Sequence, residues 1–122
     1  MSEENDVEAV QRVITAINAG DVDSAVREIH ERAEYVDQRP SHMDSFCGRD
    51  AFRPHLEAAC KAAEGAPIKL TVIASGGGQV VARQAAAGVD RWVVRTFREG
   101  LVSRVQVFAS EAEALEAAGL SE

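Results

Sequence analysis

Asp37 and His55 are the two side chains in this sequence best suited to moving a proton. Asp37 ends a stretch, 33–38, that reads as a short strand, and it shares one face with Tyr35 because side chains alternate along a strand. His55 falls in a predicted helix, and an imidazole with an unperturbed pKa of about 6.5 suits proton transfer at neutral pH. Together they could form a base and the group that orients it. A structural role stays open, since Asp37 could instead neutralise a buried arginine.

Two predicted strands near the end of the sequence, 89–98 and 101–108, carry the side chains that could hold a ligand. Glu99-Gly100 between them is typical of a two-residue hairpin turn. With that turn, the alternation of side chains places one set of residues on a single face, and we expect this face to look into the core. They are Arg91, Val93, Arg95, Phe97, Val102, Arg104, Gln106 and Phe108. Their guanidinium groups and apolar walls, with Tyr35, suit a small oxygenated or anionic organic molecule.

The opposite face of the same two strands is predicted to be apolar, and no further helix is expected to cover it. Exposed apolar faces usually mark interfaces, so we expect a homodimer through this face. The interface residues would be Trp92, Val94, Val105 and Val107. The alternative is that Trp92 and the valines face the core and the arginines face water, which a bulged turn would favour.

The elements that must position these residues follow from hydrophobic periodicity and caps. A helix, a second helix capped by Asp21, a strand and a third helix precede a four-strand meander and a last helix. That last helix is bounded by the capping box of Ser110 with Glu113 and by Gly119. The predicted ranges are helices at 5–19, 22–29, 49–63 and 111–118, and strands at 33–38, 68–72, 79–87, 89–98 and 101–108. This order indicates an α+β fold with a largely antiparallel sheet, and 39–48 reads as a loop.

Size and charge narrow the classes of function. A chain of 122 residues fits one domain, 1–122, and a hydrophobic content of 46% with 27% charged residues is ordinary for a globular protein. The net charge of -7 disfavours nucleic acid and anionic membranes as partners, since both are negatively charged. The acidic N-terminus and the lack of a long apolar run predict a cytoplasmic protein with no membrane span. Cys47 and Cys60 are then expected to be reduced, although one disulfide stays open.

No metal and no cofactor are expected. His30 and His42 have no carboxylate at ligand spacing. Gly76-Gly77-Gly78 lacks the Lys-Ser/Thr pair of a phosphate loop and precedes a strand, so it reads as a turn.

Several stretches resemble the NTF2-like superfamily, which includes ketosteroid isomerases and SnoaL-like proteins. Residues 10–23 resemble the first-helix signature of the isomerases, and Tyr35-Val36-Asp37 resembles their first strand. Residues 97–102 resemble the hairpin typical of SnoaL-like proteins. The likeness spans nearly the whole chain, with further matches at 48–52 and 112–120. It implies an NTF2-like cone, in which a curved, mostly antiparallel sheet wraps around the N-terminal helices.

Carried over residue by residue, the resemblance supports only part of a known site. Asp37 falls where the isomerases keep their base, and His55 resembles an aromatic residue that lines their pocket. Val13 and Val93 stand where they keep two oxyanion-binding side chains, so steroid isomerisation is not expected. Epoxide hydrolases of this fold pair an Arg with an Asp; Arg91 matches the Arg, but Val93 replaces the Asp.

Two functions follow from this partial match. The first is small-molecule binding with cofactor-free isomerase, cyclase or hydratase chemistry. In it Asp37 would be the base, His55 would assist, and Arg91 and Arg104 would hold ligand oxygens. The second is a non-catalytic ligand-binding or dimerisation module of the same fold, in which Asp37 simply neutralises the arginines. Whether the protein is an enzyme, and on what substrate, is left open by the sequence.

Overall fold

A computed structural model describes residues 3–40 and 44–120. Its elements, in chain order, are α1 (Glu3–Asn18), α2 (Val22–Arg27), β1 (Ile29–Asp37), β2 (Ser45–Cys47), α3 (Arg49–Gly65), β3 (Lys69–Gly76), β4 (Gln79–Ala86), β5 (Val89–Arg98), β6 (Leu101–Phe108) and α4 (Glu111–Ala118). The predicted succession of helices, meander and final helix is confirmed. Two details differ: β1 begins at Ile29, earlier than expected, and the short strand β2 lies within the predicted loop.

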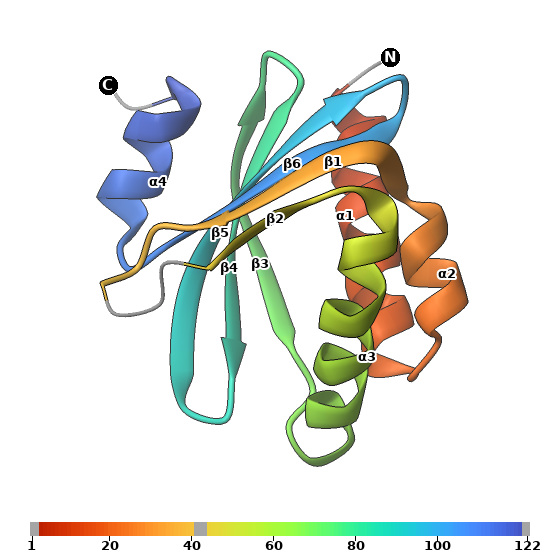
Figure 1. Cartoon of the computed structure of the whole chain (residues 1–122). Helices are drawn as coiled ribbons and strands as arrows, with labels where there is room; N and C mark the ends of the chain where they lie inside the picture. The colour runs from red at the N-terminus through yellow and green to blue at the C-terminus, as the bar shows by residue number, and fades with distance from the viewer. Residues whose placement is uncertain (1–2, 41–43, 121–122) are drawn as a thin grey trace.

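In this part of the chain the strands form one six-stranded sheet in the order β2-β1-β6-β5-β4-β3. Only the β1–β6 pair is parallel, and the other neighbours are antiparallel. The sheet curves around α1, α2 and α3, while α4 lies on its other side (Figure 1). The predicted α+β class and the cone-like, mostly antiparallel architecture are therefore confirmed.

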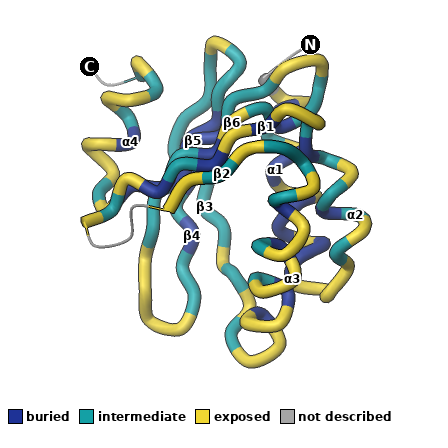
Figure 2. Tube along the Cα trace, viewed as in Figure 1, coloured by how far each residue is buried: buried dark blue, intermediate teal, exposed yellow. Residues whose placement is uncertain are grey.

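The core lies between the inner, concave face of the sheet and the helices α1 to α3. Buried residues concentrate at the strand centres and on the helix faces turned toward the sheet (Figure 2). Val13 of α1, Phe52 and Leu56 of α3 and Val93 of β5 all belong to this cluster. Helical periodicity is the reason, because residues three and four apart point to one side of each helix.

Local signals position the ends of several elements as predicted. The Asp21 carboxylate accepts a hydrogen bond from the Ser24 backbone N–H, which caps α2. The Ser110 hydroxyl accepts one from the Glu113 N–H at the start of α4, and Gly119 ends that helix in the left-handed conformation. These caps satisfy backbone groups that a helix end leaves without partners.

Three two-residue turns join the strands of the meander. Gly77-Gly78, Ala87-Gly88 and Glu99-Gly100 all have positive φ at both positions. Two successive positive φ values are the signature of the type I′ turn, whose twist matches that of the flanking strands. The hairpin predicted at Glu99-Gly100 is confirmed, with Arg98 opposite Leu101 and Phe97 opposite Val102.

Beyond that turn, the predicted facing of β6 is wrong. Phe97 pairs with Val102 but Thr96 pairs with Arg104, so Ser103 is an extra residue in β6, a β-bulge. The Ser103 hydroxyl donates a hydrogen bond of 3.1 Å to the carbonyl of Thr96 at this point. A one-residue shift moves every later side chain to the other face of a sheet.

The bulge exchanges the two sets of residues predicted for β6. Val105 and Val107, expected in a dimer interface, are 7% and 2% exposed and lie in the main core. Arg104, Gln106 and Phe108, expected inside the cone, lie on the outer face of the sheet, opposite Thr96, Val94 and Trp92 respectively. The facing predicted for β5 is correct, since Val93 and Arg95 are buried on the inner side.

Helix α4 also corrects the expectation that the outer face lacks a covering helix. Val81, Val94 and Phe108 form a second, smaller buried cluster with Ala114 of α4. Partly buried apolar residues surround it, among them Trp92 and Ile73. Val94 is fully buried in this cluster, so the chain itself already covers one of the predicted interface residues.

Candidate functional site

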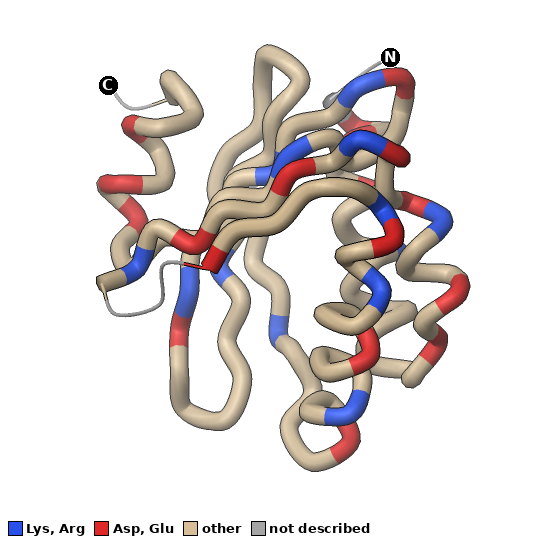
Figure 3. The backbone as a smooth tube through the Cα atoms, in the orientation of Figure 1, with Lys and Arg blue, Asp and Glu red and all other residues tan. Residues whose placement is uncertain are grey.

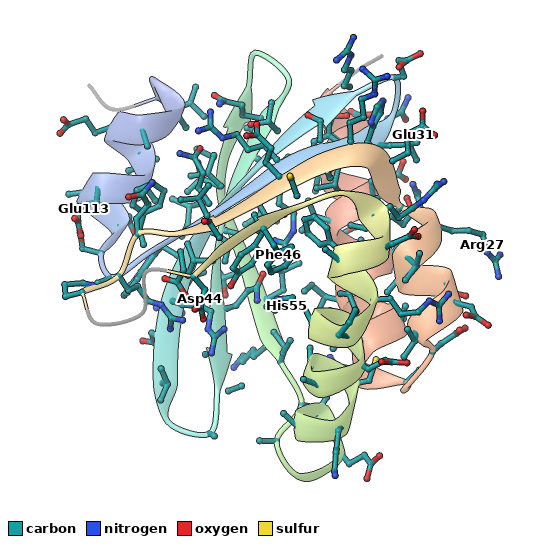
Figure 4. The ribbon with its side chains drawn as sticks, viewed as in Figure 1. Arg27, Glu31, Asp44, Phe46, His55 and Glu113 are labelled. Atoms are coloured by element: carbon teal, nitrogen blue, oxygen red, sulfur yellow. The ribbon has the colours of Figure 1, made fainter. Side chains whose placement is uncertain are left out.

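An aromatic cluster lies under the curved sheet, where β1 and β2 face α3. The Tyr35 and Phe46 rings stack with centroids 4.7 Å apart, and the His55 ring lies 4.5 Å from Tyr35 and 5.5 Å from Phe46. Phe52 meets both aromatic rings edge-on. Figure 4 shows Phe46 and His55 reaching from β2 and α3 into the same interior region. The fold thus builds one wall of a site around the imidazole of His55.

The electrostatic surroundings favour the neutral form of His55. Burial lowers the pKa of its imidazole, and the positive charges of Arg91 and Arg95 lower it further. The carboxylates of Asp37 and Asp44 act in the opposite direction, with smaller effect. A neutral imidazole can accept a proton, which is the state a general base needs.

Tyr35 complements this imidazole as a donor. Burial raises the pKa of its phenol, and the nearby Asp37 charge raises it further. The hydroxyl therefore keeps its proton at neutral pH. Tyr35 is buried on the inner face of β1, as the alternation of the strand predicts.

Arg95 is a buried guanidinium group on the inner face of β5. Arg95 is 7% exposed, and its Nη2 donates a 2.7 Å hydrogen bond to Oε1 of Gln84 on the neighbouring strand β4. Burial lowers the pKa of Arg95 to about 10, so the group still carries its charge at neutral pH. Its Nη1 is buried without a hydrogen-bond partner among the described residues.

A small cavity adjoins this pair between α3 and the strands β4 and β5. Its volume is about 100 Å³. Gln84 and Arg91 supply its polar walls, and alanines supply most of the rest. The lining residues are Ala59, Ala62, Ala63, Ala66, Ile68, Gln84, Ala86 and Arg91. A ligand held in this cavity has to be small.

Asp37 is engaged by a residue that the sequence interpretation did not consider. Nε and Nη2 of Arg39 donate to Oδ1 and Oδ2 of Asp37 at 2.9 and 2.6 Å, and the Arg39 backbone N–H also donates to Oδ1. The Asp37 side chain is 3% exposed and that of Arg39 is 13% exposed. The hydrogen bond to Asp37 raises the pKa of Arg39. The expected ion pair to Asp37 thus exists in this fold, with Arg39 rather than an arginine of the last two strands.

The fold brings together most of the residues predicted for the site. Tyr35, Asp37, His55 and Arg95 converge on the inner side of the sheet, and Val93 is part of the core beside them. The bulge in β6 excludes the three residues expected from that strand. Sequence reasoning missed Gln84, Phe46 and Arg39. Of these, Gln84 could have been found from the sequence. The inward positions of β4 are Val80, Ala82, Gln84 and Ala86, and Gln84 is the one polar residue among them.

Larger hollows occur at the surface, away from this site. One of about 710 Å³ lies between α1 and α2, with polar residues such as Gln11, Arg12 and Glu28 around it. Among the described residues, no group of three or more His, Cys, Asp or Glu is arranged to hold a metal ion. No helix in the described ranges is long and apolar enough to cross a bilayer.

No protein-family model matches the sequence, and no curated protein matches it significantly. Solved structures do match the fold. The epoxide hydrolase/cyclase-like enzyme SalBIII, described in pyran ring formation in the polyether salinomycin, superposes with a TM-score of 0.75 at 24% identity, over 91% of this chain and 95% of that one. A SnoaL-like protein of unknown function from Burkholderia thailandensis gives 0.74 at 15% identity, over 90% and 98%.

A putative polyketide cyclase from Xanthomonas campestris gives a TM-score of 0.68 at 20% identity over 98% of both chains. At these identities the similarity establishes the fold, and the predicted likeness to NTF2-like and SnoaL-like proteins is confirmed at that level. The reaction has to be argued from the site itself.

Proposed function

We propose that the interior of this NTF2-like fold binds a small oxygenated organic molecule and catalyses proton transfer on it without a cofactor. Isomerisation, cyclisation and hydration are the reaction types that such chemistry serves. One observation carries the proposal: a partly buried imidazole, His55, whose neutral form is favoured by desolvation and by two guanidinium groups. A base beside fixed positive charges is the pairing needed to remove a proton and stabilise the resulting oxyanion.

In this mechanism His55 accepts a proton from a carbon next to a ligand carbonyl. The electron pair moves toward the carbonyl oxygen, and the charges of Arg95 and Arg91 stabilise the negative charge that develops there. Protonated His55 then returns the proton at another carbon or at an oxygen. Tyr35, whose phenol keeps its proton, lies beside the imidazole and supplies a further donor.

We assign proton transfer to His55 and a positioning role to Asp37. Both carboxylate oxygens of Asp37 already accept hydrogen bonds from Arg39, so they are engaged as acceptors in an ion pair. The Asp37 charge still acts on both Tyr35 and His55, which supports a positioning role for it. Its removal would alter the electrostatics around the base without removing the base.

The solved structures support this reaction class. Neighbours with the same fold are described as an epoxide hydrolase/cyclase-like enzyme, a putative polyketide cyclase and a putative ketosteroid isomerase. Those descriptions concern the neighbours themselves. They name hydrolase, cyclase and isomerase proteins with this architecture, and this supports the reaction class proposed here.

A non-catalytic ligand-binding module is the second candidate. The cavity volume of about 100 Å³ favours this second candidate, because pockets that bind larger organic molecules usually have several times that volume. The Asp37–Arg39 ion pair also fits a structural purpose. Both candidate functions use the same interior, so an experiment that distinguishes them has to measure ligand binding and catalysis separately.

A solvent-exchange experiment separates them. Small ketones are incubated with the protein in D₂O, and NMR follows both deuterium incorporation next to the carbonyl and the imidazole signals of His55. We expect catalysed exchange in the wild type and in His30→Gln, whose ring contacts the Glu99 carboxylate, and none in His55→Gln. Binding with no exchange would establish the module instead. Equal exchange in His55→Gln would remove His55 from the mechanism.

We further infer a homodimer, with the outer face of the sheet as its contact surface. This surface includes Trp92 and Ile73, large apolar side chains that α4 leaves only partly covered. The edge strand β3 and the start of β4 adjoin this surface and bear no charged residue from 70 to 82 (Figure 3). Sheet edges usually carry charges that prevent pairing with another chain.

The cytoplasmic location expected from the sequence stays a prediction.

A further inference from the structure

Arg95 is a buried positive charge with no negative partner in the described part of the chain. The ion pairs found there join Arg12 with Glu28, His30 with Glu99, Arg39 with Asp37 and Arg53 with Asp23. Arg95 is bonded instead to the neutral amide of Gln84, and its Nη1 is left without a partner. Burying a charge is costly, and a well-placed counter-ion offsets part of that cost. An unpaired guanidinium group in a core is therefore a feature that a bound anion would explain.

The same guanidinium group is hydrogen-bonded to a residue that lines the interior cavity. Gln84, whose Oε1 accepts its hydrogen bond at 2.7 Å, is one of the residues that line that cavity. Arg91 lines it as well, and both arginines act electrostatically on His55. The cavity is thus lined by one arginine, Arg91, and reaches a second, Arg95, through the side chain of Gln84.

We propose that the ligand of this interior is a small monocarboxylate, whose carboxylate oxygens accept hydrogen bonds from the Arg95 guanidinium group while its carbon chain lies in the alanine-lined cavity. The proposal rests on the proposed function, because it needs an interior that admits a small molecule. It adds the chemical class of that molecule and the residue that selects it. A planar guanidinium fork matches a carboxylate better than it matches a single carbonyl oxygen.

The cavity walls supply the second half of the specificity. Ala59, Ala62 and Ala63 of α3 and Ile68 offer methyl groups and no hydrogen-bonding side chains. An inorganic anion would leave these apolar walls without contacts, whereas an aliphatic chain buries its surface against them. A volume of about 100 Å³ matches a short chain such as that of propionate and excludes a fused-ring molecule.

The test compares propionate with propionamide, which has nearly the same shape and no charge. Both are titrated into the wild-type protein at constant ionic strength, with backbone and imidazole NMR signals and the melting temperature as readouts. We expect propionate to shift the signals of His55 and Gln84 and to raise the melting temperature, and propionamide to bind about tenfold more weakly or worse. Sodium sulfate at the same ionic strength serves as the control for a general anion effect. Equal effects of sulfate or of propionamide would overturn the proposal.

Two variants place the binding at Arg95. Arg95→Met removes the charge and keeps a chain of similar length, and we expect at least about a tenfold loss of propionate affinity. Arg83→Met is the matched control, because Arg83 lies opposite Trp92 on the outer side of the same sheet. It should bind propionate as the wild type does. Unchanged binding in Arg95→Met would assign the ion to another site and contradict the proposal.

One readout needs no variant, in case Arg95→Met does not fold. A carboxylate next to Arg95 and Arg91 would offset their charges, so saturating propionate should raise the pKa of His55 in the wild type. An unchanged pKa at saturation would count against the site. If ketones bind in the interior and propionate does not, the proposed function stands and the carboxylate inference fails. If neither class shifts the His55 signals, both fail.

Discussion

The carboxylate of Asp37, at the end of β1, accepts hydrogen bonds at 2.9 and 2.6 Å from Nε and Nη2 of Arg39, two residues further along the chain. This short-range pair ties the end of the strand to the loop that follows it. The sequence predicted Asp37 as the base but left open whether its carboxylate is free to react. The carboxylate is held by its neighbour, so its contribution is first of all to stability.

Asp37→Asn should therefore destabilise the fold. The substitution leaves the mostly buried Arg39 without its counter-ion, and breaking such a pair costs about 3 kcal/mol. Urea unfolding of the variant measures the loss of free energy. Glu34→Gln, an exposed acidic position on the same strand, is the control and should change stability by less than about 0.5 kcal/mol. An Asp37→Asn variant as stable as the control would contradict a structural role for the pair.

The stability of the protein should depend on the protonation of His55. Its folded pKa lies below the unfolded value of about 6.5, so the unfolded state takes up a proton first as the pH falls. The contribution of this residue is thus fully present above pH of about 6.5 and is lost as the pH drops toward the lower folded pKa. Proton transfer by neutral His55 should, for the same reason, persist below pH of about 6.5.

NMR titration of the imidazole signals checks the direction of this shift, and urea unfolding across the same pH range checks its effect on stability. His55→Gln should lose the part of the pH dependence that falls in this window. A wild-type midpoint at or above the unfolded value would show that the burial and the arginine charges do not act on His55 as described.

Ala87→Asn should stabilise the hairpin between β4 and β5. Ala87 has a φ of 54° and is followed by Gly88 at 77°, a type I′ turn in which Asn-Gly is the preferred pair. An alanine in this left-handed region costs about 1 kcal/mol, and asparagine tolerates the region better. Urea unfolding should show a gain of about 0.5 kcal/mol.

Gly88→Ala is the opposite test at the same turn. A Cβ at Gly88 would meet nothing within 4 Å, so any loss of stability would come from the backbone alone. We expect a loss of about 1 kcal/mol. Equal stability of the two variants would mean that the turn conformation differs from the one described.

Trp92→Glu should convert the inferred homodimer to monomers. The indole lies at the border of the small cluster under α4, where a charge would meet an apolar surface. Light scattering gives the native mass of the wild type and the variant. Thr15→Glu, an exposed position on α1 and so on the other side of the sheet, introduces the same charge as a control. A monomeric wild type would reject the dimer outright.

Much of the fold could be predicted because its signals are local. The caps at Asp21 and Ser110 and the turn at Glu99-Gly100 each depend on a few neighbouring residues. The alternation along β5 correctly placed Arg95 inside, since side chains in an uninterrupted strand point to alternate faces. The order of these elements was then enough to indicate an α+β cone.

In β6, the spacing of the apolar residues already indicated the bulge, but the sequence interpretation did not use it. Val102 is out of phase with Val105 and Val107, and a phase change in alternation is what a bulge at Ser103 produces. The two-residue turn was correct, but the register it sets holds only as far as the strand remains regular. The ligand role expected for Arg104, Gln106 and Phe108 depended on that regularity.

The amino-acid sequence by itself determined the elements, their order and the inward face of β5, because these follow from interactions between residues a few positions apart. Tertiary structure alone decided which side chains meet. It paired Asp37 with Arg39, set Gln84 of one strand against Arg95 of the next, and laid α4 over the outer face. Such contacts depend on strand register and packing across the sheet, where a single extra residue reverses the side that every following side chain faces.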